Sequence, residues 1–536
     1  MRIGEGEALR LDAGASIEPA RSALNEPGVD EPGEEPSGDG EGDDSLQKLG
    51  KDTLVYGLGT VLSRAASFIM LPIYTRYLTP ADYGVLELLQ LTLDVTSILL
   101  SAGVTSGVLR FYFKADGQKE RLEIVSTAFL LLAGLNLVGS VALGLSAPWV
   151  AEIVLDRAGQ GALVRIAAVT FFFEAFVIVP MLLIQARQRP RLYVMASLSK
   201  LLLQLGLNIW LVVGLRMGVE GVLLSSLAAN VLVGGALVIW MFRITGLRYT
   251  RSAMRSLRRY GIPYQLVSAG TFVLTFGDRL VLRGYSGVDE VGIYGLAYKF
   301  GFFLVAVGST PYFRAWSPQR FRIAENHDKE ARDRRYNKGF LYLSLLTFTL
   351  ATAICLYVWP TLRIMSDPEF HVAANIVPVV VAAYVFQILK DVVELGIEVS
   401  ERTKFATAAT WLSVVVTAGL YFLLIPPLDG MGAALATLLG FIVRFGAFYY
   451  FSQQLWHVDY RWKRHLYLGG ISAAVVAAFY LLRPERLPAQ IGLATALLAS
   501  YVLMTWYLVL EGEERETLVS ASGTLPGMIR SALTEA

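Results

Sequence analysis

Runs of about twenty apolar residues, each long enough to span a bilayer as a helix, follow one another from residue 52 onward. Short polar stretches separate them. The pattern predicts an all-α polytopic membrane protein with about 14 transmembrane helices. The predicted ranges are 52–72, 84–108, 122–145, 162–185, 193–214, 219–242, 262–283, 291–313, 337–358, 373–397, 404–426, 430–452, 467–482 and 490–510.

Lysine and arginine gather in every second connection between these runs. Four arginines lie between residues 251 and 259, and eight basic residues lie between 314 and 338, whereas the alternate connections hold isolated residues such as Arg76 and Arg157. Cytoplasmic loops retain positive charge during membrane insertion. Both termini are therefore predicted to face the cytoplasm, which requires an even number of helices.

Two pairs of similar strings suggest an internal repeat. Residues 77–85 align with 285–293, and residues 221–227 align with 432–438, at offsets of 208 and 211. A duplicated six-helix unit would give two lobes, 48–242 and 262–452, related by a pseudo-two-fold axis along the membrane normal. Chance similarity of short apolar strings is the alternative explanation.

The remaining segments connect or follow these two lobes. Residues 243–261 place arginines around apolar side chains, which is the pattern of an amphipathic cytoplasmic linker helix at a lipid surface. Residues 453–510 supply two further transmembrane helices, and residues 511–536 form a cytoplasmic tail. Residues 1–44 hold thirteen Asp or Glu against three Arg, so they are predicted to be a disordered acidic cytoplasmic tail.

Composition excludes several classes of protein. With 54% hydrophobic and 17% charged residues, the chain is too apolar for a large soluble enzyme. The single cysteine, Cys355, excludes an internal disulfide, and the four histidines have no metal-ligand spacing. No phosphate-binding Walker loop is present, so direct use of ATP is not expected. Enzyme motifs are absent, and no cofactor, metal site or nucleic-acid partner is expected.

Two strings resemble a known family. They are Leu71-Pro-Ile-Tyr-Thr-Arg-Tyr-Leu-Thr-Pro-Ala-Asp-Tyr-Gly84, preceded by residues 58–64, and the second-half series 260–263, 277–279 and 292–294. They resemble the Wzx-like polysaccharide flippases of the multidrug/oligosaccharidyl-lipid/polysaccharide exporter (MOP) superfamily, over residues 48–510. The two C-terminal helices depart from the twelve-helix form of that branch.

The resemblance carries several implications. It implies two six-helix lobes around a central cavity in a bacterial cytoplasmic (inner) membrane. It also implies export of an isoprenoid diphosphate-linked oligosaccharide for cell-surface polysaccharide synthesis, driven by Na⁺, H⁺ or the membrane potential. The expected partners are this lipid-linked substrate and membrane lipids, with a glycan polymerase or glycosyltransferases as further candidates.

Ionisable side chains at membrane depth are costly and are therefore candidates for function. Arg64, Arg279 and Lys299 are candidate substrate-binding residues, because a guanidinium binds a diphosphate through paired hydrogen bonds. Glu87, Asp94 and Asp278 are candidates for charge balance or ion coupling. The structural alternative is that Arg64 and Arg279 pair with carboxylates to fix helix packing, or that residues 278 and 279 snorkel toward the membrane surface. Residues assigned to structural pairs or the interface are Glu174, Lys200, Lys390, Asp391, Glu394 and Arg444.

Three competing functions remain open on sequence grounds. A peptidoglycan lipid-precursor flippase would share the diphosphate, and a multidrug/cation antiporter of the same superfamily would present a net acidic cavity. A membrane glycosyltransferase or polymerase would normally need a sizeable extracytoplasmic loop, which the short predicted outer connections do not provide.

Overall fold

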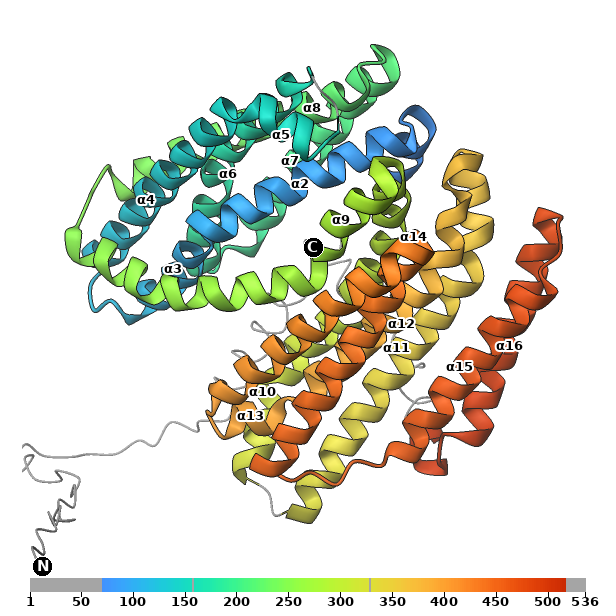
Figure 1. The fold of residues 1–536 in the computed structure, drawn as a ribbon. Helices are drawn as coiled ribbons and strands as arrows, with labels where there is room; N and C mark the ends of the chain where they lie inside the picture. Colours follow the sequence, from blue (N-terminus) through green and yellow to red (C-terminus); the bar gives the residue numbers. More distant parts are fainter. Residues whose placement is uncertain (1–69, 157–158, 327–328, 517–536) are drawn as a thin grey trace, which may run out of the picture. The chain divides into compact units, whose positions relative to one another are not determined.

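The computed structural model describes residues 70–156, 159–326 and 329–516, and every regular element in these ranges is helical (Figure 1). Eleven of the described helices are long and apolar enough to cross a membrane. The predicted class, an all-α polytopic membrane protein, is confirmed. The predicted first span, 52–72, lies almost entirely outside the described residues.

The helices follow one another with short connections. Residues 70–77 are helical and precede the labelled elements. The labelled elements are α2 (Pro80–Leu100), α3 (Ala102–Lys114), α4 (Gln118–Leu145), α5 (Ala147–Ile153), α6 (Gly161–Ala186), α7 (Pro190–Asn208), η1 (Ile209–Gly214), α8 (Gly218–Thr245), α9 (Arg251–Leu304), η2 (Val305–Ser309), α10 (Thr310–Asn326), α11 (Lys329–Met365), η3 (Pro368–Val372), α12 (Ala373–Val393), α13 (Leu395–Val399), α14 (Thr403–Leu455), α15 (Trp462–Leu482) and α16 (Leu487–Leu508).

Two of these helices each contain two of the predicted spans. Helix α9 changes direction at Gly287, whose φ is 86°, and α14 does so at Asp429, whose φ is 49°. Each break falls between two predicted spans, so every predicted span after the first has a helical counterpart. Residues 251–261 form the first turns of α9 and continue into the next predicted span without an intervening loop.

Helix α2 begins at a strong N-terminal cap. The Thr79 hydroxyl accepts a hydrogen bond from the backbone N–H of Asp82 at 3.2 Å, and the Asp82 carboxylate accepts one from the N–H of Thr79 at 3.3 Å. Pro80 occupies the first helical position, where its missing N–H costs nothing. Thr79, Pro80 and Asp82 of the string that carries the family resemblance therefore form the N-terminal cap of this helix.

Helices α2 and α9 touch backbone to backbone at two glycines. A Cβ atom on Gly84 would overlap the carbonyl oxygen of Val288, and one on Gly292 would overlap that of Pro80. Only glycine fits at such an approach. These two glycines are also the positions that align in the proposed repeat, so the matching strings of the two halves meet at this crossing.

Apolar side chains hold the helices in two cores. Helices α3, α4, α6 and α8 share one core with Leu257 of α9. The larger core joins α2 to α9, α11, α12 and α14. Helix α9 thus packs against α2, α3 and α4 and also against α12 and α14 (Figure 1).

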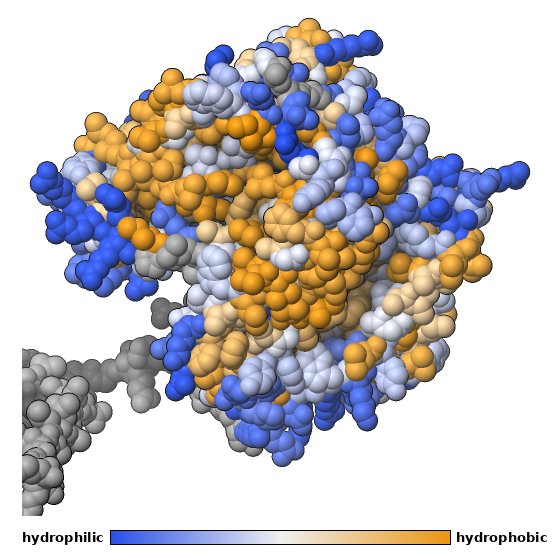
Figure 2. Space-filling model, viewed as in Figure 1, coloured by the Kyte–Doolittle hydropathy of each residue, from blue (hydrophilic) through white to orange (hydrophobic). Residues whose placement is uncertain are grey.

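The last two helices pack on α11 through Val475, Phe479 and Tyr501. They leave other apolar side chains exposed, among them Leu481 at 84%. Figure 2 shows apolar side chains covering the middle of the visible face, with hydrophilic side chains mostly toward its margins. Exposed apolar surface of this kind is expected where helices face lipid.

Candidate functional site

A cavity of about 340 Å³, lined by both polar and apolar side chains, lies among the helix at residues 70–77, α2, α6, α7, α8 and the second part of α9. Pockets that bind small molecules usually measure roughly 300 to 1,000 Å³, so this one is at the lower end. Its polar lining residues are Tyr74, Tyr83, Glu87, Gln90, Thr170, Glu174, Gln204, Ser226 and Lys299.

An ion pair between Glu87 of α2 and Lys299 of α9 forms part of the cavity wall. The Lys299 Nζ lies 2.8 Å from Glu87 Oε1, and the two side chains are 34% and 14% exposed. Gly295 makes this approach possible, because a Cβ there would lie only 2.7 Å from Glu87 Cγ. The pair therefore links the two halves of the chain and can still be reached from the cavity.

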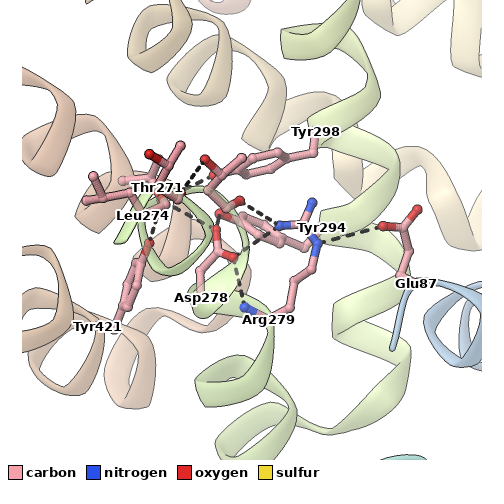
Figure 3. Close-up of polar contacts among 10 residues, drawn as sticks. Glu87, Thr271, Leu274, Asp278, Arg279, Tyr294, Tyr298 and Tyr421 are labelled. Carbon is pink, nitrogen blue, oxygen red and sulfur yellow. Dashed lines mark hydrogen bonds and ion pairs between the residues drawn. The ribbon is translucent and has the colours of Figure 1, made fainter. Parts of the chain in front are cut away.

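Behind this pair lies Arg279 of α9, whose side chain is only 1% exposed. Its guanidinium contacts Asp278 at 3.1 Å and Glu87 at 3.7 Å (Figure 3). The guanidinium also lies 4.3 Å from the centroid of the Tyr298 ring and 5.1 Å from that of Phe276. Carboxylates and aromatic faces thus replace water around this cation.

Asp278 is fully buried and connects α9 to α14. Its carboxylate accepts a short hydrogen bond from the Tyr294 hydroxyl and another, at 3.4 Å, from Thr437. The Tyr421 hydroxyl of α14 donates nearby to the carbonyl of Leu274 (Figure 3). The suggestion that Asp278 and Arg279 snorkel to the membrane surface is wrong for this conformation, because both side chains are enclosed by protein.

The four groups form one charge-balanced cluster. Glu87 contacts both Lys299 and Arg279, while Asp278 contacts Arg279. Two cations and two carboxylates thereby cancel formally, which lowers the cost of holding charge away from water. The structure brings together four of the six candidate residues, from segments far apart in the sequence.

Of the other two candidates, only Asp94 lies among the described residues. Asp94 is bound by the side-chain amide of Gln90 at 3.0 Å and makes no ion pair among the described residues. Arg64 lies outside the described residues, so its predicted contact with substrate stays a prediction, and so does the alternative that it pairs with a carboxylate.

Sequence reasoning missed Glu174. The sequence assigns it to structural or interfacial pairs, yet it lines the cavity from α6. Its position in the middle of α6 was a usable signal, since the same insertion cost had identified Glu87. The prediction was right for Lys390, which pairs with Asp391 and Glu394 at 2.7 Å each.

No group of three or more potential metal ligands of the His, Cys, Asp and Glu types occurs among the described residues. The cavity instead offers charge, amides, hydroxyls and aromatic rings. Such a lining suits a polar or charged organic ligand.

Comparison with known proteins assigns the chain to a family. The family described as "Polysaccharide biosynthesis protein" matches residues 73–375, more than half of the 536 residues. The chain belongs to this family. The matched region includes α2, the whole of α9 and hence the cluster formed by Glu87, Asp278, Arg279 and Lys299.

Curated relatives are distant. The chain is 24% identical to "Lsg locus putative protein 1" of Haemophilus influenzae over 261 residues, which cover 46% of this chain and 60% of that protein. It is 22% identical to an uncharacterized membrane protein of Methanocaldococcus jannaschii over 200 residues, or 36% of this chain and 38% of that protein. The matches span less than two thirds of each relative.

Solved structures share the fold. The lipid II flippase MurJ in an inward closed conformation aligns with a TM-score of 0.66 at 11% identity, covering 85% of this chain and 99% of that one. An inward-facing MATE family multidrug transporter of the MOP superfamily aligns with a TM-score of 0.59 at 13% identity, covering 80% and 99%. The predicted resemblance to a polysaccharide-related family is confirmed by the family match, the solved structures show the same fold, and this family member is a multi-pass membrane protein.

Proposed function

We propose that this protein is a flippase that moves an isoprenoid diphosphate-linked oligosaccharide across the bacterial cytoplasmic membrane for surface polysaccharide synthesis. The observation that carries the proposal is the Glu87–Lys299 ion pair in the cavity wall, with Arg279 behind it. Membership of the polysaccharide biosynthesis protein family supports the glycan part. The Lys299 ammonium in the cavity wall can bind a phosphate, which supports a diphosphate-linked substrate.

The diphosphate would bind by replacing Glu87 as the partner of Lys299. Lys299 is held by one carboxylate and is one-third exposed, so a phosphate in the cavity can compete for it. Arg279 is enclosed and is a positioning residue in this conformation, because it holds Glu87 from behind at 3.7 Å. When the ligand leaves, Glu87 neutralises Lys299 again and the empty cavity resets without a net buried charge.

Contacts at one end of the helices would have to break during the cycle. The Arg76 guanidinium donates to the carbonyl of Ile364 at 2.7 Å, and the backbone N–H of Asp367 donates to that of Thr75 at 3.2 Å. These bonds join the helix that precedes α2 to the end of α11. Opening of the cavity at this end therefore requires their loss, and a coupling ion or the membrane potential would bias that step.

A binding measurement tests the role of Lys299. The Lys299→Gln variant should bind a synthetic isoprenoid diphosphate sugar roughly tenfold or more weakly, because a hydrogen bond to a charged group is worth about 1.5–3 kcal/mol. The double variant Glu87→Gln/Lys299→Gln keeps the charge balance and should bind as weakly. Lys463→Gln, at an exposed position outside the cavity, is the control. Equal binding by Lys299→Gln and the control would refute the proposal.

A second candidate function, export of an organic cation, is favoured by one observation. Glu87 and Glu174 line the cavity together with a single cationic side chain, Lys299, although Arg279 lies behind Glu87. For a cation exporter, Glu174→Gln should abolish binding of a cationic dye, and Lys299→Gln should strengthen it. The flippase proposal expects Lys299→Gln to weaken binding of the diphosphate sugar and neither variant to bind the dye.

A further inference from the structure

A second charged cavity, of about 570 Å³, lies where α11 and α15 begin and the chain leaves α16. It shares no lining residue with the cavity around Glu87 and Lys299. Its cationic lining residues are Arg334, Arg335, Lys338, Arg461 and Arg464. Its acidic lining residues are Glu511, Glu513 and Glu514. The cations therefore exceed the carboxylates by two.

Glutamate side chains of the segment 511–514 already occupy part of this cavity as ion-pair partners of its cations. Arg464 pairs with Glu511 and, at 2.7 Å, with Glu514, and Lys338 pairs with Glu513 at 3.2 Å. Within the part of the chain that the structure describes, Arg335 and Arg461 form no ion pair. The cavity thus has more positive charge than the carboxylates around it neutralise, and it can accept a further anion.

The inner wall of the cavity points to an amphiphilic ligand. His465 is 5% exposed, stacks on Phe340 with ring centroids 3.8 Å apart, and lies 2.9 Å from the Ser344 hydroxyl. The same histidine lines an apolar cavity of about 740 Å³ between α11, α12, α14 and α15. A ligand with a phosphate and an acyl chain could fill both cavities, whereas a free phosphate could use only the first.

The location agrees with a lipid headgroup. Helix α11 has 37 residues, and at about 1.5 Å per residue it is longer than the roughly 30 Å hydrocarbon core of a membrane. Its first turns, with Arg334, Arg335 and Lys338, therefore reach the headgroup region or beyond. Basic pockets between membrane helices at this level are suited to lipid phosphates.

We propose that the cavity lined by Arg335, Arg461 and Arg464 binds the phosphate of an anionic phospholipid, and that residues 511–514 compete with this phosphate. In the conformation described here, the carboxylates hold Arg464 and Lys338. An anionic lipid would displace them and fix the starts of α11 and α15 to the membrane surface. The site is a lipid-dependent control point separate from the cavity proposed for the substrate.

Lipid retention by the purified full chain tests this proposal. The protein is reconstituted with phosphatidylcholine and phosphatidylglycerol, transferred to detergent, and the lipids that remain bound are measured by mass spectrometry. Wild type should retain phosphatidylglycerol preferentially. Arg335→Gln/Arg461→Gln should lose retention by roughly fivefold for each charge removed, the effect expected of one cation near an anionic surface.

The matched control is Lys329→Gln/Lys463→Gln, which removes the same charge from exposed positions in the first turns of α11 and α15, outside the cavity lining. It should retain phosphatidylglycerol as wild type does. Glu511→Gln/Glu513→Gln/Glu514→Gln should retain more than wild type, because it removes the competing carboxylates. Misfolding could explain a loss of retention but not a gain, so the triple variant tests the site independently of the double variant.

Three results would overturn the proposal. Equal losses in the two double variants would mean that only general surface charge matters. Displacement of phosphatidylglycerol by inorganic phosphate would indicate a site for a free anion. Unchanged retention in the glutamine triple variant would show that residues 511–514 do not compete with lipid.

Discussion

Glu87 holds two cations at once, so its removal should destabilise the protein in a way that removal of Lys299 corrects. In Glu87→Gln, Lys299 loses a partner at 2.8 Å and Arg279 loses one at 3.7 Å, although Arg279 keeps Asp278. Removing one partner of a fully buried pair costs about 3–5 kcal/mol. Lys299 is 34% exposed, so partial solvation should reduce the cost to about 1–3 kcal/mol.

A double-mutant cycle measures this coupling. Thermal unfolding in detergent is followed for wild type, Glu87→Gln, Lys299→Gln and the double variant. The double variant should be more stable than Glu87→Gln alone, with a coupling free energy of about 0.5–3 kcal/mol. The control cycle uses Glu330 and Arg334, an exposed pair with an expected coupling of about 0–1 kcal/mol. Additive effects at Glu87 and Lys299 would refute the charge-balance argument.

Three further predictions test the packing, the helix cap and the orientation. Gly292→Ala should destabilise the protein by about 1–3 kcal/mol in thermal unfolding, because its Cβ would overlap the backbone of α2. The control is Gly284→Ala on the same helix, whose Cβ would meet nothing within 4 Å and which should be neutral or stabilising. Thr79→Ala should cost about 1 kcal/mol in the same assay, while Thr79→Ser, which keeps the capping hydroxyl, should cost less. A cysteine in place of exposed Glu330 should react with an impermeant reagent only after the cells are permeabilised. Labelling in intact cells would refute the prediction that this residue faces the cytoplasm.

The spans could be predicted from the sequence because a membrane helix needs a long apolar run and little else. Details within the spans could not. The break at Ser101 between α2 and α3 lies inside one predicted span, and no charge or proline marks it. Conversely, the breaks at Gly287 and Asp429 fall between predicted spans, yet each leaves so short a connection that the helices adjoin directly.

The candidate site was predictable as a set of residues but not as a set of contacts. The cost of placing charge in a membrane identified Glu87, Arg279 and Lys299 one at a time. Their pairing depends on the glycine crossing of α2 and α9, which brings distant segments together. Burial of Asp278 by Tyr294 depends on the packing around both residues, and no local pattern in the sequence specifies it.

Transport by the purified protein tests the central claim most directly. The chain is reconstituted into proteoliposomes with an isoprenoid diphosphate-linked oligosaccharide, and arrival of the glycan at the opposite leaflet is followed with a membrane-impermeant glycosidase. Wild type should expose the glycan faster than empty liposomes, and Glu87→Gln/Lys299→Gln should match the empty liposomes although its charge balance is kept. Glycan movement at the wild-type rate in that variant, or none in wild type under either an ion gradient or a membrane potential, would contradict the account.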